Sequence, residues 1–132
     1  REHVSLVFQD HNLIDYLTPE ENLRLVNPKA DMKILEDLGL SREESKRNIM
    51  HLSGGQRQRV AVGRALVAPG RAILADEPTG SLDPEMTDEV IDLLRHAAHQ
   101  LGKCVIVVTH SKRVADSADA VYTLRHKKLA KA

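Results

Sequence analysis

The chain contains three short runs of mostly apolar residues, and each run ends in polar side chains. Runs of about five residues that are rich in β-branched side chains predict buried strands. They are Val4–Phe8, Arg71–Ala75 and Cys104–Val108. A fourth pattern, at Ala120–Leu124, predicts a last strand followed by a basic tail.

Residues 18–50 carry helix signals instead, and they predict a small all-helical unit. A capping box with proline at Thr18–Glu21 begins the first helix, and Asn27-Pro28 ends it. The second helix has an apolar face at Ile34, Leu35 and Leu38, with Gly39 as its C-cap. A second capping box at Ser41 and Glu44 predicts a third helix toward Asn48.

In the second half of the chain, helices alternate with the predicted strands. Leu52–Gln56 leads into a helix over Arg57–Val67, Asp83-Pro84 begins a long helix that Gly102 ends, and Ser111 caps a short one. Strands that alternate with helices predict an α/β fold with a parallel sheet.

Composition and charge exclude several classes of protein. The 132 residues have the size of one ordinary domain, and 19 Lys and Arg balance 19 Asp and Glu, so no global field favours nucleic acid. One cysteine, Cys104, excludes an internal disulfide and a Cys-rich zinc module, as expected in a reducing compartment. No apolar run approaches the roughly 20 residues of a membrane span. We therefore expect a cytosolic protein.

Polar residues that follow the predicted strands are the first candidates for chemistry. They are Gln9, Asp76-Glu77 and Thr109-His110. Each also has an interpretation without a catalytic role. The glutamine can be an ordinary loop residue, the acidic pair can lie in a solvated turn, and the histidine can hydrogen-bond to a backbone group. Because parallel strands bind ligands at their carboxyl ends, we expect them to converge on one crevice suited to metal-assisted phosphoryl or hydrolytic chemistry.

Leu52-Ser53-Gly54-Gly55-Gln56 gives the sharpest signal. Two glycines let the backbone approach a ligand closely, and a serine hydroxyl beside free amides at a helix N-terminus suits anionic oxygens such as those of phosphate. The alternative is an N-cap with a flexible entry loop.

The order of these segments resembles that in the ATP-binding subunits of ABC transporters. Val7-Phe8-Gln9 resembles the Q-loop, Leu52–Gln56 the signature, Ala72–Glu77 the Walker B strand with its glutamate, Ser81-Leu82-Asp83 the D-loop and Thr109-His110 the switch histidine. The segments Phe8–Ile14 and Leu17–Leu23 resemble those of the exporter branch that includes lipoprotein-releasing, macrolide and bacitracin-type ATPases and a cell-division relative.

The resemblance implies a P-loop NTPase core of the ABC type, with a parallel sheet and a small helical subdomain. Residues 17–67 would form the helical and signature subdomain, and residues 1–16 and 68–132 would belong to the ATPase core. Because the chain opens at Arg1 rather than a methionine, we expect it to be the C-terminal portion of one nucleotide-binding domain, an incomplete core.

The resemblance also assigns roles, with ATP and Mg²⁺ as the ligands. Asp76 and Gln9 would hold Mg²⁺, Glu77 would polarise the attacking water, and Gln9 and His110 would reach the γ-phosphate. The nucleotide-binding set that faces the ATP of a second subunit would be Ser53, Gly54, Gly55, Gln56 and Asp83, with Asp83 also signalling across the interface.

The implied partners are a second nucleotide-binding subunit and membrane permease subunits, contacted through the helical unit and the loop after Gln9, with no nucleic acid. The protein would then lie at the cytoplasmic face of the cell membrane. For Arg57, Arg59 and Arg64 we expect structural or solvated charges rather than ligands.

The sequence departs from the family in one respect that matters for activity. No two glycines are spaced five apart with lysine following, and Gly102-Lys103 lies between a helix and a strand, so a Walker A motif is missing from these residues. We therefore expect the isolated chain neither to bind ATP tightly nor to hydrolyse it.

The missing motif also has a structural consequence. In the family, the phosphate-loop strand lies between the strand that ends at His110 and the strand at Ala120–Leu124, so we expect an open slot there. The chain would close this gap, exchange elements with a second copy or leave its last strand poorly ordered. Arg125–Lys128 occupies a hairpin turn where the family commonly has Asp-Gly.

Two other functions remain open on these residues. One is a non-transport ABC-type ATPase of the cell-division or repair kind, although the neutral charge and the short segment between Gln9 and Leu52 disfavour DNA repair. The other is a truncated, non-catalytic fragment that pairs with intact subunits through its signature and D-loop surfaces.

Overall fold

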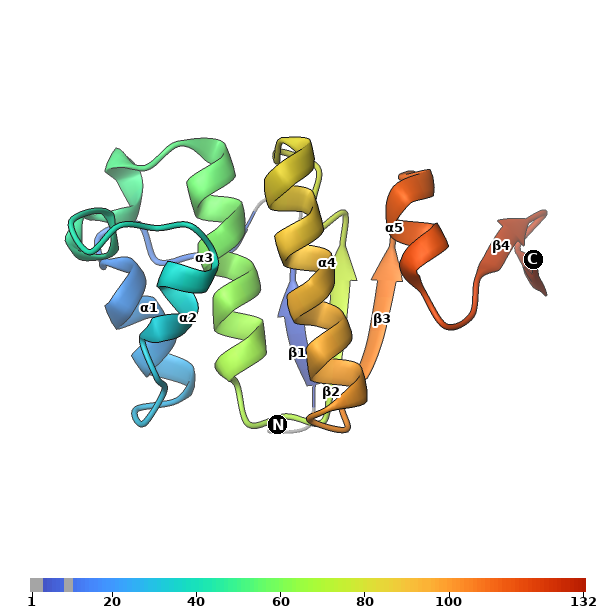
Figure 1. The fold of residues 1–132 in the computed structure, drawn as a ribbon, viewed down its shortest axis with the longest axis horizontal. Helices are drawn as coiled ribbons and strands as arrows, with labels where there is room; N and C mark the ends of the chain where they lie inside the picture. Colours follow the sequence, from blue (N-terminus) through green and yellow to red (C-terminus); the bar gives the residue numbers. More distant parts are fainter. Residues whose placement is uncertain (1–3, 9–10) are drawn as a thin grey trace.

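Three parallel strands form the main sheet of the protein. A computed structural model describes residues 4–8 and 11–132. β1 (Val4–Val7), β2 (Ala72–Asp76) and β3 (Cys104–Val108) lie in the order β1-β2-β3, with Ala72 opposite both Val4 and Cys104 (Figure 1). The predicted parallel α/β sheet is therefore confirmed, with β2 shifted by one residue.

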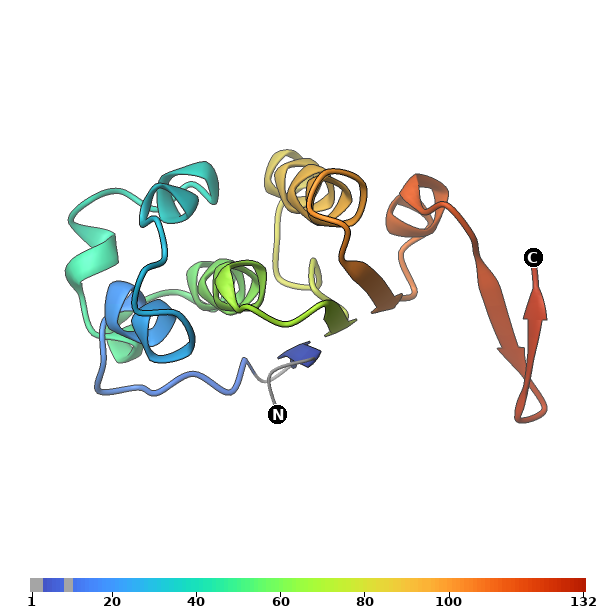
Figure 2. The same cartoon turned by 90° about the horizontal axis from the view of Figure 1, so that it is seen from below.

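Two helices cover one face of this sheet. α3 (Gly54–Val67) packs on β1 and α4 (Pro84–His99) packs on β3, both on the same side (Figure 2). α1 (Pro19–Val26) and α2 (Lys33–Asp37) pack against α3, and α5 (Lys112–Ser117) follows β3. Fully buried aliphatic side chains from strands and helices form one core between these layers, among them Val7, Leu23, Leu38, Val60, Ile73 and Val90.

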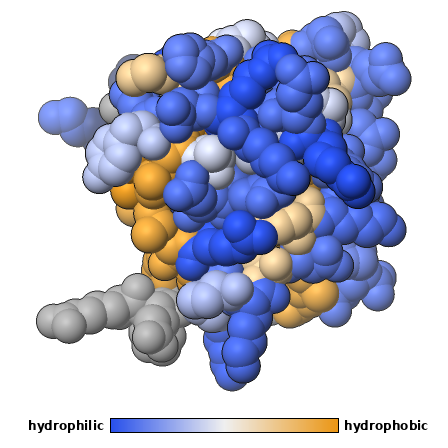
Figure 3. Space-filling view, turned by 90° about the vertical axis from the view of Figure 1, so that its left-hand side faces the viewer, coloured by the Kyte–Doolittle hydropathy of each residue, from blue (hydrophilic) through white to orange (hydrophobic). Residues whose placement is uncertain are grey.

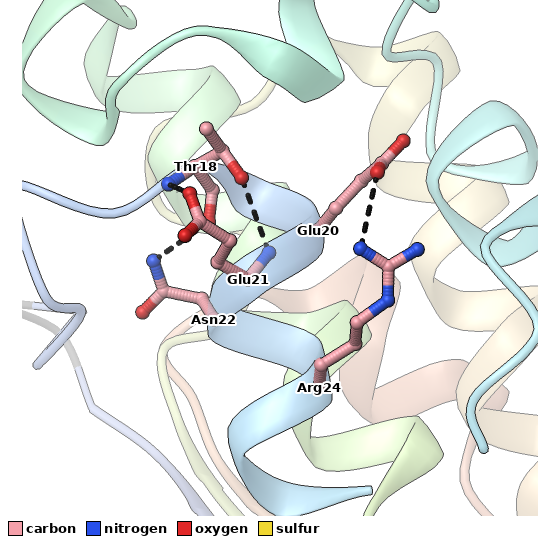
Figure 4. A network of polar contacts seen from close by, with 5 residues as sticks. All are labelled: Thr18, Glu20, Glu21, Asn22 and Arg24. Atoms are coloured by element: carbon pink, nitrogen blue, oxygen red, sulfur yellow. Dashed lines mark hydrogen bonds and ion pairs between the residues drawn. The ribbon is translucent and has the colours of Figure 1, made fainter. Parts of the chain in front are cut away.

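The capping box that begins α1 forms as predicted (Figure 4). The Glu21 amide donates to the Thr18 hydroxyl, and the Thr18 amide donates to the Glu21 carboxylate, each at 3.1 Å. The buried Asn22 side chain adds a clamp, because its amide donates to the carbonyls of Ile14 and Thr18 and its oxygen accepts from the Ile14 amide. The helix and the loop before it are thus held together.

The helix predicted after Ser41 is wrong. Its capping box forms, but the chain makes two 3₁₀ turns, η1 (Glu44–Lys46) and η2 (Ile49–His51), separated by extended backbone. The reason is long-range: the Ile49 amide donates to the Leu17 carbonyl, and the Ile49 side chain is fully buried. These contacts draw the segment onto the loop before α1 and interrupt a regular helix.

The last residues form a hairpin outside the main sheet. β4 (Tyr122–Arg125) pairs with β5 (Lys128–Lys131), so the predicted basic tail is itself a strand. His126 and Lys127 make the predicted turn with φ of 49° and 62°. Among the described residues nothing pairs with the outer edge of β3, and the hairpin stands apart from it (Figures 1 and 2). The chain does not close the expected gap with these residues, and the last strand is not poorly ordered, because β4 pairs locally with β5.

The second face of the sheet is open within the described part of the chain. Val4, Leu6, Leu74, Ile106 and Val108 point away from α3 and α4 and keep between 38% and 63% of their surface exposed. Figure 3 shows apolar surface gathered along one margin of the molecule. The prediction that these strands are buried is therefore correct for one face only, because both covering helices pack on the other.

Candidate functional site

The ends of the strands and the beginnings of two helices lie at one edge of the molecule. α3 and α4 run opposite to the strands, so their N-termini lie near the carboxyl ends of β1, β2 and β3, at the top of Figure 1. Helix N-termini carry free amides and partial positive charge, so this edge suits an anionic ligand. Gln9, predicted to end the first strand here, lies outside the described residues.

Glu77 is held against the segment that follows β3. Its amide donates to the Val108 carbonyl at 2.8 Å, and its carboxylate accepts from the Thr109 hydroxyl at 3.2 Å and from the His110 amide at 2.7 Å. The structure thus brings the polar ends of β2 and β3 together. Glu77 has φ of 48°, a left-handed backbone that costs energy for a side chain with a Cβ and is held by these contacts.

The signature segment forms the N-terminus of α3. Ser53 is the N-cap: its hydroxyl accepts from the Gln56 amide at 3.1 Å, and the Gln56 side chain accepts from the Ser53 amide at 2.8 Å. The N-cap alternative is therefore correct as local geometry. It does not exclude ligand binding, because this cap does not use the amides of Gly54 and Gly55.

The two glycines of this segment have different surroundings. A Cβ on Gly55 would lie 3.0 Å from the Ser81 carbonyl oxygen, whereas a Cβ on Gly54 would meet nothing within 4 Å. Gly55 thus permits close packing on the segment before α4, and Gly54 faces open space. Asp83 caps α4 by accepting from the Met86 amide at 2.8 Å.

The three arginines of α3 bind backbone carbonyls, as predicted for structural charges. Arg57 donates to Ile49 and Met50, Arg59 to Leu38, Gly39 and Gly55, and Arg64 to His11 and Asn12. Burial lowers the pKa of the Arg64 guanidinium. These side chains fasten α3 to the loops around it.

The donor set at this edge fits a magnesium ion that is shared with phosphates. In the part of the chain that the structure describes, no three His, Cys, Asp or Glu residues lie close enough to enclose a metal. Mg²⁺ usually keeps several waters and takes only one or two carboxylates beside substrate phosphates. Asp76 is exposed at the end of β2, directly before Glu77, and supplies such a carboxylate.

Gln58 is a polar residue near the site that sequence reasoning missed. Its side chain is 1% exposed, its oxygen lies 2.9 Å from His11 Nε2, and its amide donates to the Glu77 carbonyl at 3.4 Å. A signal was present in the sequence, because Gln58 shares the helical spacing of Ala61, Val62 and Ala65, which form the buried face of α3.

Comparison with known proteins gives consistent matches. The family model described as "ABC transporter" matches residues 1–80. The chain is 36% identical to the uncharacterized ABC transporter ATP-binding protein YclH of Bacillus subtilis, covering 89% of this chain and 57% of YclH. It is 41% identical to the lipoprotein-releasing system ATP-binding protein LolD of Rickettsia prowazekii, covering 94% of this chain and 60% of LolD.

Solved structures agree with these matches. The dimeric post-hydrolysis state of the ATP-binding cassette MJ0796, bound to ADP and Pi, superposes with a TM-score of 0.86 and 32% identity, over 98% of this chain and 63% of that one. The chain thus spans about three fifths of the length of such proteins. No helix among the described residues is long and apolar enough to cross a membrane.

Proposed function

Because the chain belongs to the ABC transporter ATP-binding family, we propose that its residues supply the hydrolytic edge and the signature segment of a transporter's ATP-binding cassette. The observation that carries the proposal is the Glu77 carboxylate held between the His110 amide and the Thr109 hydroxyl. That edge also holds the Ser53-capped N-terminus of α3. The cassette would couple ATP binding and hydrolysis to transport by membrane subunits.

In this proposal, Glu77 orients and polarises the water that attacks the γ-phosphate. Gln9 and His110 complete that arrangement, and Asp76 with Gln9 holds Mg²⁺, which neutralises phosphate charge when bound. The fixed position of the Glu77 carboxylate supports the assignment, because phosphoryl transfer depends mainly on positioning and on electrostatic stabilisation.

The signature segment would serve an ATP held by a second subunit. Ser53 and Gln56 shape the N-terminus of α3, and the amides of Gly54 and Gly55 would face the γ-phosphate. Asp83 would lie at the same interface, next to the segment on which Gly55 packs. MJ0796, a relative of similar fold, is a dimer in its solved structures, which supports the shared arrangement.

We assign residues 17–67 to a helical and signature subdomain, and residues 1–16 and 68–132 to the ATPase core. The helical unit and the loop after Gln9 would contact the membrane subunits at the cytoplasmic face of the membrane. Tyr16 and Met50 support this, because both are large, more than half exposed, and lie on segments joined by the Met50 amide to the Asp15 carbonyl.

The 132 residues alone would neither bind ATP tightly nor hydrolyse it, because they contain no lysine-bearing phosphate loop. The melting temperature of the chain in millimolar Mg-ATP tests this directly. We expect no change, and a rise of several degrees would contradict the proposal, since it would show nucleotide bound to the folded chain.

The catalytic assignment is tested in a joined cassette. The joined cassette is a fusion protein. Its first part is the segment of Rickettsia prowazekii LolD that precedes the matched region, and we expect the phosphate-binding loop in that segment. This segment is fused to Val4 of the present chain. The fusion should hydrolyse ATP. Glu77→Gln should abolish turnover and keep ATP binding, whereas Glu89→Gln, at an exposed position of α4, should change neither. Full activity of the Glu77 variant would refute its role.

A further inference from the structure

A buried amide links Glu77 to the loop that follows β1. Gln58 lies on the buried face of α3, where a methionine would fill a similar volume without polar atoms. A polar group buried in a core costs free energy unless hydrogen bonds satisfy it. Packing alone therefore does not explain a glutamine, and its hydrogen-bond partners do.

Both partners of Gln58 have unusual backbone conformations. His11, which lies 2.9 Å away, has φ of 69°, and Glu77, whose carbonyl accepts at 3.4 Å, has φ of 48°. Non-glycine residues hold such conformations only where the surrounding structure fixes them. A single side chain thus contacts two residues with left-handed backbone that lie 66 positions apart, the first through its imidazole and the second through its carbonyl.

The orientation of the Glu77 peptide determines where its carboxylate points. The Glu77 carbonyl also accepts from the Gly80 amide at 3.2 Å, so Gln58 and Gly80 both fix the position of this carbonyl. If Gln58 no longer donates, the Glu77 backbone can relax toward a common negative φ. Its carboxylate would then leave the His110 amide, which it accepts from at 2.7 Å.

We propose that Gln58 is a positioning residue: its amide aims the Glu77 carboxylate and couples this aim to the loop after β1. Arg64 holds the same loop at the carbonyls of His11 and Asn12, so α3 fixes both the loop and the glutamate. A movement of the loop would be transmitted to Glu77 through His11 and Gln58. The inference deepens the proposed function, because it assumes that Glu77 acts on water.

Amide hydrogen exchange on the 132-residue chain tests the positioning directly. In Gln58→Met, the His110 amide should exchange about tenfold faster, the effect of losing one hydrogen bond, relative to the buried Leu94 in α4. Gln100→Met, at the exposed end of α4, is the matched control and should change neither amide. An equal rise at both amides, or none, would show a role in stability only and overturn the proposal.

A second variant leaves the core intact. His11→Ala removes the other hydrogen-bond partner of Gln58, which lies in a half-buried loop. The side-chain amide of Gln58 is then less firmly held, so the exchange rate of the His110 backbone amide should rise roughly threefold. His51→Ala, at an exposed position of η2, should have no such effect. If His110 exchange does not respond to His11→Ala, the loop is not coupled to the glutamate.

Kinetics of the joined cassette give an independent readout. Gln58→Met should lower kcat at least about tenfold and leave the KM for ATP within about twofold, because misplacement acts on the reacting groups. Unchanged kcat in an active fusion would overturn the proposal. If the unmutated fusion has no ATPase activity, the proposed function fails, and the exchange measurements still decide the role of Gln58.

Discussion

Replacing the two glycines of the signature segment by alanine, one at a time, should affect stability differently. A methyl group on Gly55 would lie 3.0 Å from the Ser81 carbonyl oxygen and 3.8 Å from Leu82 Cδ2, whereas one on Gly54 would enter open space. Both positions are helical, so alanine fits the backbone of each. The two substitutions therefore share their chemistry and differ in what the new methyl group contacts.

The magnitudes follow from two competing terms. Alanine is favoured over glycine in a helix by up to about 1 kcal/mol, and overpacking a tight contact costs about 1–3 kcal/mol. Gly54→Ala should therefore be neutral or stabilising, and Gly55→Ala should lose up to about 2 kcal/mol. The variants thus differ by the overpacking cost of about 1–3 kcal/mol. At this chain length 1 kcal/mol corresponds to about 4 °C, so their melting temperatures should differ by about 4–12 °C.

Thermal unfolding of the 132-residue chain, followed by circular dichroism without nucleotide, measures this difference. Equal melting temperatures for the two variants, or a more stable Gly55 variant, would refute the contact with Ser81. In the joined cassette, Gly54→Ala should lower turnover without lowering stability, because Gly54 is proposed to face the phosphate. Normal turnover would argue against that placement.

Three further predictions concern the local structure. Thr18→Ala should cost about 1 kcal/mol in chemical denaturation, and Ser41→Ala less, because its hydroxyl accepts from the Glu44 amide before a 3₁₀ turn and not at a regular helix; equal losses would contradict this. Leu23→Ala should cost about 2–5 kcal/mol because Leu23 is fully buried, while Leu25→Ala, 60% exposed, should stay within about 0.5 kcal/mol; similar values would show that the core is misassigned. Replacing His126 by Asn and Lys127 by Gly should favour the hairpin by about 1 kcal/mol, because both positions have positive φ, and cross-strand amide contacts measured by NMR should strengthen; unchanged contacts would contradict the turn geometry.

Features that depend on neighbouring residues could be predicted from the sequence. The capping boxes at Thr18 and Ser41, the proline after Asp83 and the positive φ at Gly39 and Gly102 all appear where local chemistry requires them. The meeting of Glu77 with Thr109 and His110 also followed, because parallel strands end at the same edge of a sheet.

Features that depend on long-range contacts could not be predicted. The segment after Ser41 has helical signals, but the Ile49 amide binds the Leu17 carbonyl and the regular helix is lost. The open face of the sheet could not be predicted, because an apolar run predicts a strand but does not show which face of the sheet the helices will cover. The role of Gln58 required knowing that Glu77 lies next to α3.

The register of the sheet also bears on the order in which the chain folds. Ala72 pairs with Cys104, 32 positions later, through the single helix α4, but it pairs with Val4 across 68 positions that include the whole helical unit. Each doubling of a closed loop adds about 0.6 kcal/mol of entropy cost, and non-local pairings form slowly. We therefore expect β2, α4 and β3 to assemble first and β1 to dock last. The loop after β1 would then bring His11 to Gln58 only in the final step of folding, so the candidate site is completed when the sheet is.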